Sequence, residues 1–192
     1  MRFPRLSVLA PMLAALAILR PAQAQPNPPS DDARPRFHAD LEVDPTAYVL
    51  DGYSLHAGLG WNRVRLDLGA FAMKVPEAIH GQRDFDVGFD GFGAKLQFFP
   101  FAEQSGLVLG ADSGVARRLI QRKHTQLAER EHQVTLGLNV GYRIDIAGGW
   151  YATPWLGLSR ALGATDARLG DAHYESSPWL LFPAVHIGYH LR

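Results

Sequence analysis

The stretch "VTLGLNVGYRI", residues 134–144, alternates apolar side chains with small or polar ones over its whole length. Because successive side chains of an extended chain leave opposite faces, this period of two predicts a β-strand. The pattern alone leaves the surroundings open, since a soluble barrel buries its apolar face and a membrane barrel turns that face toward lipid. One face carries Val134, Leu136, Leu138, Val140, Tyr142 and Ile144, and the other carries Thr135, Gly137, Asn139, Gly141 and Arg143.

The N-terminus predicts export. Arg2 and Arg5 precede an apolar run at 6–19, which is followed by Ala22-Gln23-Ala24, the pattern of a secretory signal peptide over residues 1–24. No later stretch reaches the ~18 apolar residues that a membrane-spanning helix needs. Residues 25–35, "QPNPPSDDARP", hold four prolines and predict a disordered lead-in to a single domain at 36–192.

Composition limits the class of protein. Removing 24 of the 192 residues leaves 168, which is enough for one stable domain. The chain has no cysteine, so that domain forms without disulfides. Arg2, Arg5 and Arg20 are removed with the signal peptide, so the mature chain keeps 16 of the 19 basic residues and all 19 acidic residues. A net charge of −3 argues against a nucleic-acid partner.

Eight alternating runs follow one another along the chain. Their connections alternate in length, and this is the layout of a transmembrane barrel with short periplasmic turns and long outer loops. The sequence therefore predicts an all-β, closed, eight-stranded antiparallel up-and-down transmembrane β-barrel. The runs cover 37–43, 53–61, 64–72, 92–98, 107–115, 134–144, 150–158 and 185–191; the short connections lie at 62–63, 100–106 and 145–149, and the long ones at 44–52, 74–84, 119–131 and 161–177.

Two further patterns favour lipid outside the barrel. The polar face is rich in glycine, which leaves room for a few long polar side chains inside a narrow barrel, whereas a lipocalin-like soluble barrel would need a richly charged exterior. Aromatic residues gather at strand ends, as at membrane interfaces. One expected girdle is Trp61, Phe98, Phe99, Phe101, Tyr142, Trp150 and Tyr189, and the other is Phe85, Phe89, Trp179 and Phe182. The parity of the apolar residues changes between 85–89 and 92–98, so we expect a β-bulge near Gly91.

In these features the chain resembles the eight-stranded bacterial outer-membrane barrels of the OmpA and OmpX kind over residues 36–192. The closing segment "HIGYHLR" is similar to the C-terminal assembly signal of those proteins, with Arg192 in place of the usual terminal aromatic. The resemblance implies a monomer in the outer membrane of a Gram-negative bacterium. It also implies contact with the barrel-assembly machinery, outer-membrane lipid and lipopolysaccharide.

The inward-facing charges predict a filled lumen. Closure of the last strand on the first sets His190 near His38, and His186 near Asp40 or Glu42. Buried charges persist only when they are paired, so we expect a polar network rather than a catalytic or metal site. His186 and His190 lie roughly 13 Å apart along one strand, too far to share an ion, and no cofactor is expected. The expected network is His38, Asp40, Glu42, His56, Arg65, Asp67, Lys95, Asp112, Arg143, His186 and His190.

The third long loop begins with four cations, Arg117, Arg118, Arg122 and Lys123. Such cations bind phosphate through charge-assisted hydrogen bonds, which predicts contact with lipopolysaccharide. The alternative is a solvated loop whose charge Glu129 and Glu131 partly balance.

The leading functional hypothesis is a non-enzymatic barrel that acts through its outer loops, in surface or lipopolysaccharide contact, envelope integrity or adhesion. The first alternative is a lipid A-modifying enzyme, a deacylase or acyltransferase, and its support is "HYESS" at 173–177 and two strand prolines, Pro154 and Pro183, that could weaken a seam for a lipid chain. The His-to-Ser spacing of "HYESS" does not match that of the lipid A deacylases. The second alternative is a narrow pore for small solutes.

Overall fold

The computed structural model describes residues 37–191. The predicted signal peptide at 1–24 and lead-in at 25–35 lie outside the described residues. Among the described residues, no helix combines the length and apolar character needed to cross a membrane.

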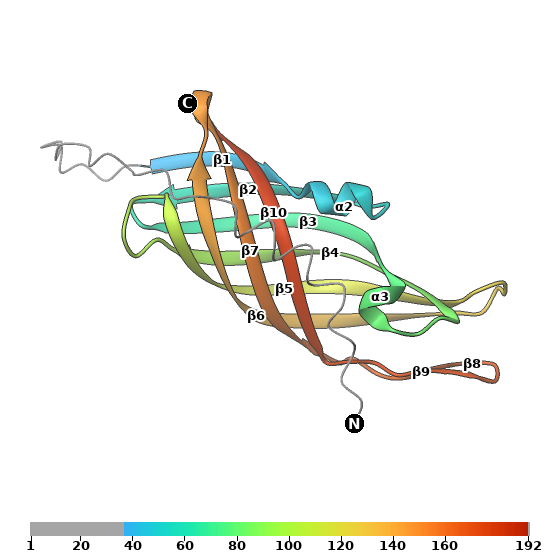
Figure 1. The fold of residues 1–192 in the computed structure, drawn as a ribbon. Helices are drawn as coiled ribbons and strands as arrows, with labels where there is room; N and C mark the ends of the chain where they lie inside the picture. Colours follow the sequence, from blue (N-terminus) through green and yellow to red (C-terminus); the bar gives the residue numbers. More distant parts are fainter. Residues whose placement is uncertain (1–36, 192) are drawn as a thin grey trace, which may run out of the picture. The chain divides into compact units, whose positions relative to one another are not determined.

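Eight strands form one closed antiparallel barrel, as predicted (Figure 1). Each strand pairs with its neighbour in the chain, and the first pairs with the last, in the order β1-β10-β7-β6-β5-β4-β3-β2. The barrel strands are β1 (Phe37–Val43), β2 (Tyr53–Trp61), β3 (Val64–Val75), β4 (Phe85–Phe98), β5 (Gly106–Arg122), β6 (Ala128–Asp145), β7 (Trp150–Leu162) and β10 (Trp179–Leu191).

Three of the four long connections carry further elements, which gather at one end of the barrel (Figure 1), while the short β6–β7 connection holds the 3-10 helix η2 (Ala147–Gly149). The first long connection holds α2 (Pro45–Val49), which begins after Asp44, whose side chain accepts a hydrogen bond from the Thr46 amide. The second holds α3 (Glu77–His80), and the fourth holds a separate hairpin of β8 (Ala167–Leu169) and β9 (Ala172–Tyr174). At the opposite end, Asn62 makes the β2–β3 turn with φ of 52°, a conformation that asparagine tolerates well.

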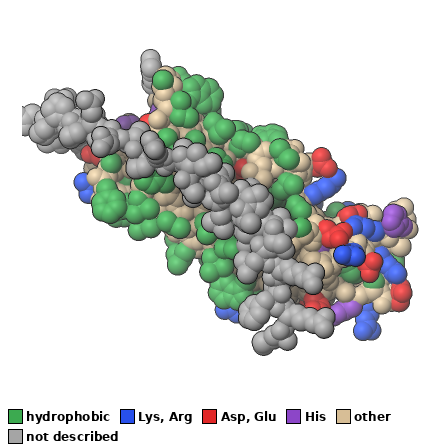
Figure 2. Space-filling model, in the orientation of Figure 1, with side chains coloured by type: hydrophobic (Ala, Val, Ile, Leu, Met, Phe, Trp, Pro, Cys, Tyr) green, Lys and Arg blue, Asp and Glu red, His purple; other side chains and the backbone are tan. Residues whose placement is uncertain are grey.

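The apolar face of the strands points outward. Leu138 is 70% exposed and Leu68 is 56% exposed, although both lie in the middle of regular strands. Figure 2 shows hydrophobic side chains over the strands, with most of the visible charged side chains at the end that carries α3 and the β8–β9 hairpin. A continuous exposed apolar surface of this kind requires a nonaqueous partner.

The strands near the outer loops are longer than the sequence predicts. Residues 119–131 were expected to form a loop, but β5 and β6 remain paired up to Gln121 and Ala128. The error has a physical reason. We call the exposed apolar surface of the strands the apolar belt. Between this belt and the loops, both faces of a hairpin can be polar. The alternation that identifies a strand then disappears, although the two strands remain hydrogen-bonded.

The predicted bulge near Gly91 is wrong. The register of β4 is continuous with β3 and with β5, from Phe85↔Arg122 to Phe98↔Leu109 in the second case. Phe85 and Val87 instead point inward and are buried, so the parity of apolar residues changes because the interior itself becomes apolar near the loops. Phe99 and Phe182, expected in the girdles, also turn inward, where Phe99 stacks beneath Arg143 and Phe182 packs on Trp155.

Candidate functional site

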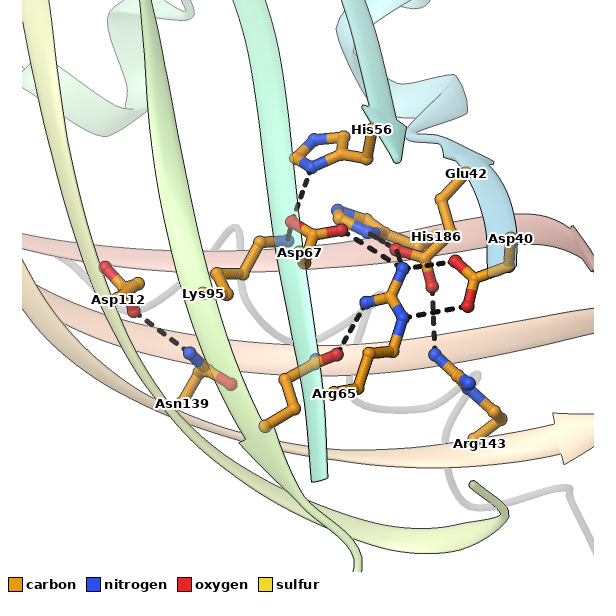
Figure 3. Close-up of polar contacts among 11 residues, drawn as sticks. Asp40, Glu42, His56, Arg65, Asp67, Lys95, Asp112, Asn139, Arg143 and His186 are labelled. Atoms are coloured by element: carbon orange, nitrogen blue, oxygen red, sulfur yellow. Dashed lines mark hydrogen bonds and ion pairs between the residues drawn. The ribbon is translucent and has the colours of Figure 1, made fainter. Parts of the chain in front are cut away.

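The lumen is organised around Arg65, which points inward from β3 and is completely buried (Figure 3). Its guanidinium binds Asp40 of β1 through two contacts, Nε to Oδ2 at 3.0 Å and Nη2 to Oδ1 at 2.5 Å. Its Nη1 donates to Gln97 Oε1 at 2.6 Å. This two-pronged geometry matches the planar fork of arginine to a carboxylate and fixes both groups.

Glu42 joins Arg65 to the far wall of the lumen. Its carboxylate lies 3.2 Å from Arg65 Nη2, 3.1 Å from Arg143 Nη2 of β6, and 3.0 Å from His186 Nδ1 of β10. Closure of the barrel predicted that His186 lies near Asp40 or Glu42, and the structure shows the contact with Glu42. Glu42 therefore links three strands that are distant in the chain.

Asp67 forms the other branch of the network. It lies 3.1 Å from Arg65 Nη2, 2.8 Å from His56 Nδ1 and 3.5 Å from Lys95 Nζ. Three carboxylates thus face Arg65, Arg143 and Lys95, and their formal charges balance. Pairing of this kind is what allows charges to remain buried.

Two glycines leave the space that the long polar side chains of the lumen occupy. A Cβ at Gly58 would lie 2.3 Å from Arg65 Nη2, and one at Gly69 would lie 2.1 Å from His56 Nδ1. The glycines of the inward face therefore mark where long polar side chains cross the lumen, as the sequence pattern indicated.

Three of the predicted network residues lie apart from this cluster. Asp112 binds Asn139 Nδ2 at 3.0 Å and Ser159 Oγ at 3.2 Å, a separate polar group on β5, β6 and β7. His38 and His190 face each other, with ring centroids 6.4 Å apart. Within residues 37–191, no group of three or more acidic or histidine side chains is arranged to hold a metal ion.

Aromatic side chains complete the interior, and the sequence analysis missed them. Tyr151 lies flat against the Arg143 guanidinium at 4.1 Å, while Trp155 lies over Lys95 Nζ at 4.9 Å and edge-on to His186 at 5.4 Å. Both belong to the inward set of β7, and only their parity relative to Trp150 and Leu156 could have revealed this.

The loop end holds a second packed cluster. The β8–β9 hairpin lays its buried side chains on the inward residues of β4 and β5, a set that we call the apolar cap. Around it, Gln82 exchanges two hydrogen bonds with the backbone of Glu175, at 2.8 and 2.9 Å. The apolar cap consists of Phe85, Val87, Ile120, Ala167, Leu169 and Tyr174.

The four cations of the third loop have different positions. Arg117 points outward and pairs with Asp90 at 3.0 Å, whereas Arg118 points inward to Glu131 at 2.5 Å and stacks on Tyr174. Arg122 pairs with Asp171, and Lys123 lies 3.1 Å from Glu77. A surface pocket of about 250 Å³ at this end is lined by Arg83, Asp84, Arg122, Lys123 and His124.

The side chains of "HYESS" have separate partners. His173 faces Asp166, with Nε2 to Oδ2 at 3.7 Å. The Ser176 hydroxyl donates to the Thr165 carbonyl and accepts from Arg118. The contacts with Asp166 and Thr165 lie within the fourth loop, and the contact with Arg118 joins that loop to β5.

An apolar exterior, a charged interior and eight strands in closed antiparallel order define the architecture of outer-membrane barrels, and the resemblance to the OmpA and OmpX kind is confirmed at the level of the fold. No protein-family model matches the chain, and neither does any curated protein.

Solved structures similar to the chain come from several bacteria. A major outer membrane protein from Thermus thermophilus has a TM-score of 0.51 and 9% identity, covering 82% of this chain and 100% of that one. The N-terminal β-barrel domain of Pseudomonas aeruginosa OprF has a TM-score of 0.46 and 12% identity over 82% of this chain and 100% of that one. Neisserial surface protein A has a TM-score of 0.48 and 13% identity, over 80% and 94% of the two chains. At these identities the likeness to the Thermus protein supports the fold alone.

Proposed function

We propose that this chain is a non-enzymatic barrel of the Gram-negative outer membrane that holds its loops at the cell surface. The exposed apolar belt supports placement in a bilayer, and the concentration of charge at the loop end supports that end as the outer one. The fold of the Thermus outer membrane protein agrees with this placement.

The buried Arg65 cluster is the observation that carries the proposal. Arg65, Arg143, Asp40, Glu42 and Asp67 are all buried, and they cross a lumen that in an eight-stranded barrel is only wide enough for side chains. At the level of this cluster the barrel is therefore filled, so it serves as a support for its loops and not as a pore for solutes. Planar-bilayer recordings test this directly: we expect no large, steady single-channel currents, and such currents would overturn the proposal.

The proposed ligand of the outer end is the phosphate of lipopolysaccharide. Arg117 is outward-facing and half-exposed beside the apolar belt, and Lys123 lines the basic pocket near the tip of the β5–β6 hairpin. Both can form charge-assisted hydrogen bonds with phosphate. Arg118 points inward instead, where it pairs with Glu131 and donates to the Thr165 carbonyl of the fourth loop.

The contact is tested by measuring the affinity of reconstituted protein for lipopolysaccharide and for the same material after dephosphorylation. Arg117→Ala and Lys123→Ala should each weaken binding of the phosphorylated form about two- to tenfold, the loss expected for one charge-assisted hydrogen bond at an exposed site. Arg63→Ala is the matched control, because Arg63 is an exposed cation at the opposite end, where it donates to the Pro100 carbonyl. Equal affinity of all four proteins, or no dependence on phosphate, would contradict the contact.

A further inference from the structure

The closing seam of the barrel is paired over only part of its length. β1 and β10 are paired from Ala39↔Leu191 to Val43↔Ile187, where β1 ends. On its other edge β10 pairs with β7 from Tyr189↔Trp150 to Trp179↔Arg160. The outer half of β10, residues 179–186, therefore has a strand on one side only. Figure 1 shows β10 diverging from β1 and α2 toward its Trp179 end.

The helix α2 stands where β1 would continue. It contacts β2, β3 and β10, with Ala47 fully buried and Val49 81% exposed. The strand ladder on this side of β10 ends at Val43↔Ile187, and α2 does not continue it. The outer half of the seam is thus covered by side chains of a five-residue helix and not sealed by backbone hydrogen bonds.

The free edge of β10 is protected against another strand. The Ala161 amide donates to the Pro178 carbonyl, so even-numbered residues of β10 direct their backbone groups to β7 and odd-numbered residues direct theirs to the β1 side. Pro183 is odd-numbered, and its missing N–H falls on the unpaired edge. Proline on an edge opposes strand addition, which argues against a second copy as the occupant of this edge.

The β7–β10 seam, by contrast, is continuous through both prolines. Val185↔Pro154 and Pro183↔Leu156 are both in register. Pro154 interrupts the other side of β7, where the ladder with β6 passes from Gly141↔Trp155 to Ile144↔Ala152. The weakened wall is therefore the β1–β10 seam, not the seam between the two prolines.

The interior between the apolar cap and the cluster of buried charges around Arg65, which we call the charged cluster, is lined mainly by aromatic rings, with Lys95 Nζ against Trp155 at 4.9 Å on the side of the charged cluster. Trp155 and Phe182 pack at 5.8 Å between ring centroids, and Phe71 and Phe89 pack at 5.9 Å. These four aromatics are inward-facing yet only half-buried. The charged cluster lies on one side of these aromatics, and its His186 is edge-on to Trp155. The apolar cap lies on the other side, toward the loops.

We propose that the outer half of the β1–β10 seam, beside α2, is a lateral opening through which one acyl chain of an outer-leaflet lipid reaches Trp155 and Phe182. The inference rests on the proposed membrane placement. In a bilayer, acyl chains surround the outer half of this seam. The aromatic side chains inside the seam are apolar, as acyl chains are. The free edge of β10 carries Pro183, which opposes pairing with another strand. The bound chain lies between the charged cluster and the apolar cap and is held by burial of apolar surface.

Tryptophan quenching by brominated lipids tests the opening. The reporter protein keeps Trp155 as its one tryptophan through Trp61→Phe, Trp150→Phe and Trp179→Phe. It is reconstituted into phosphatidylcholine vesicles whose acyl chains carry bromine at a series of depths, and iodide is added separately as a water-soluble quencher. We expect Trp155 to lose at least half of its emission to bromolipid and little to iodide.

Two further proteins make the result interpretable. A protein retaining only Trp150, which is 50% exposed on the outer surface, reports insertion into the bilayer. Tyr151→Trp in a protein with no other tryptophan places the reporter on the same strand and inward face but within the charged half, where we expect weak quenching at every bromine depth. Phe99→Trp replaces this control should Tyr151→Trp fail to fold.

The outcomes separate the two claims. Trp150 without bromolipid quenching overturns the membrane placement itself. Trp150 quenched, with Trp155 no more quenched than the Tyr151→Trp reporter, overturns the lateral opening alone. Trp155 quenched by iodide instead of bromolipid also overturns it, because the space then holds water. A dimer in mild detergent that Pro183→Val strengthens would assign the edge to a second copy and overturn it as well.

Discussion

Arg143 and Glu42 show at the scale of single residues how the lumen is held together. Arg143 is 1% exposed and Glu42 is 2% exposed, and removal of one member of such a pair leaves the other charge buried. Arg143→Ala should therefore lower the free energy of unfolding by about 3–5 kcal/mol. Equilibrium urea unfolding in lipid vesicles measures this.

Arg160→Ala is the control for that loss. Arg160 lies over the Trp179 ring on the outer surface, and an exposed cation–π contact is worth about 0.5–1 kcal/mol. Similar losses for the two variants would mean that Arg143 contributes no more than a surface side chain.

We expect His80 to make the contact between the second and fourth loops depend on pH. Its Nδ1 accepts a hydrogen bond from the Gln82 amide at 3.3 Å, and Gln82 in turn holds Glu175. Partial burial lowers the pKa of His80 from 6.5, helped by Lys123 and opposed by Glu77. Because the released loop binds the proton more readily, the contribution of His80 to loop stability is present above about pH 6.5 and is lost as pH falls through the lower folded pKa.

Hydrogen exchange at the Glu175 amide measures this coupling. After correction for intrinsic exchange, protection should be highest above about pH 6.5 and should fall as the pH drops through the lowered pKa of His80, and His80→Gln should remove the pH dependence. Unchanged corrected protection in the wild-type protein would show that the ring does not govern the contact.

The sequence predicted individual lumen residues where closure of the barrel decided their neighbours. The antiparallel return of the last strand put His186 near Asp40 or Glu42, and in the structure it contacts Glu42. Asp112 was misplaced because which inward residues meet across a lumen depends on the tilt and stagger of the strands, which no alternation pattern reveals. Tyr151 and Phe99 were missed or misplaced because an aromatic residue near a strand end fits a girdle and a lumen equally well.

At the scale of elements, the β8–β9 hairpin should be separable from the barrel. It forms its own two-stranded sheet and is attached through the apolar cap. Tyr174→Ala should release the hairpin and speed tryptic cleavage after Arg168, which is exposed in β8. A local loss of about 1.4 kcal/mol suffices for a tenfold faster cut.

His173→Ala tests the specificity of that effect. His173 precedes Tyr174 in β9, but its side chain is 47% exposed. We expect cleavage near the wild-type rate for His173→Ala, and little change in the barrel's own unfolding midpoint for either variant. Equal cleavage of the two variants would show that the apolar cap does not hold the hairpin.

Elements were predictable inside the apolar belt and less so outside it. The belt imposes a strict period of two, which located all eight barrel strands. Beyond the belt, Arg117 to His132 carries charge on both faces, so paired strands looked like a loop. The short hairpin and the helix α2 gave no periodic signal because each is too brief to show one.

At the scale of the whole molecule, the central claim is that this chain closes into a barrel with its apolar face in lipid. In the sequence, the alternation of apolar and polar residues predicted which face of each strand points outward. The alternating lengths of the connections predicted the up-and-down order of the strands. What the loops contact follows from chemistry at their surface, which alternation does not encode.

The most direct test is electrophoresis of the purified protein, folded in detergent or lipid, with and without boiling. A closed barrel resists the gel detergent until it is heated, so the unboiled sample should be β-rich by circular dichroism and migrate differently from the boiled one. Protein that remains soluble without detergent and keeps one mobility under both conditions would contradict the account.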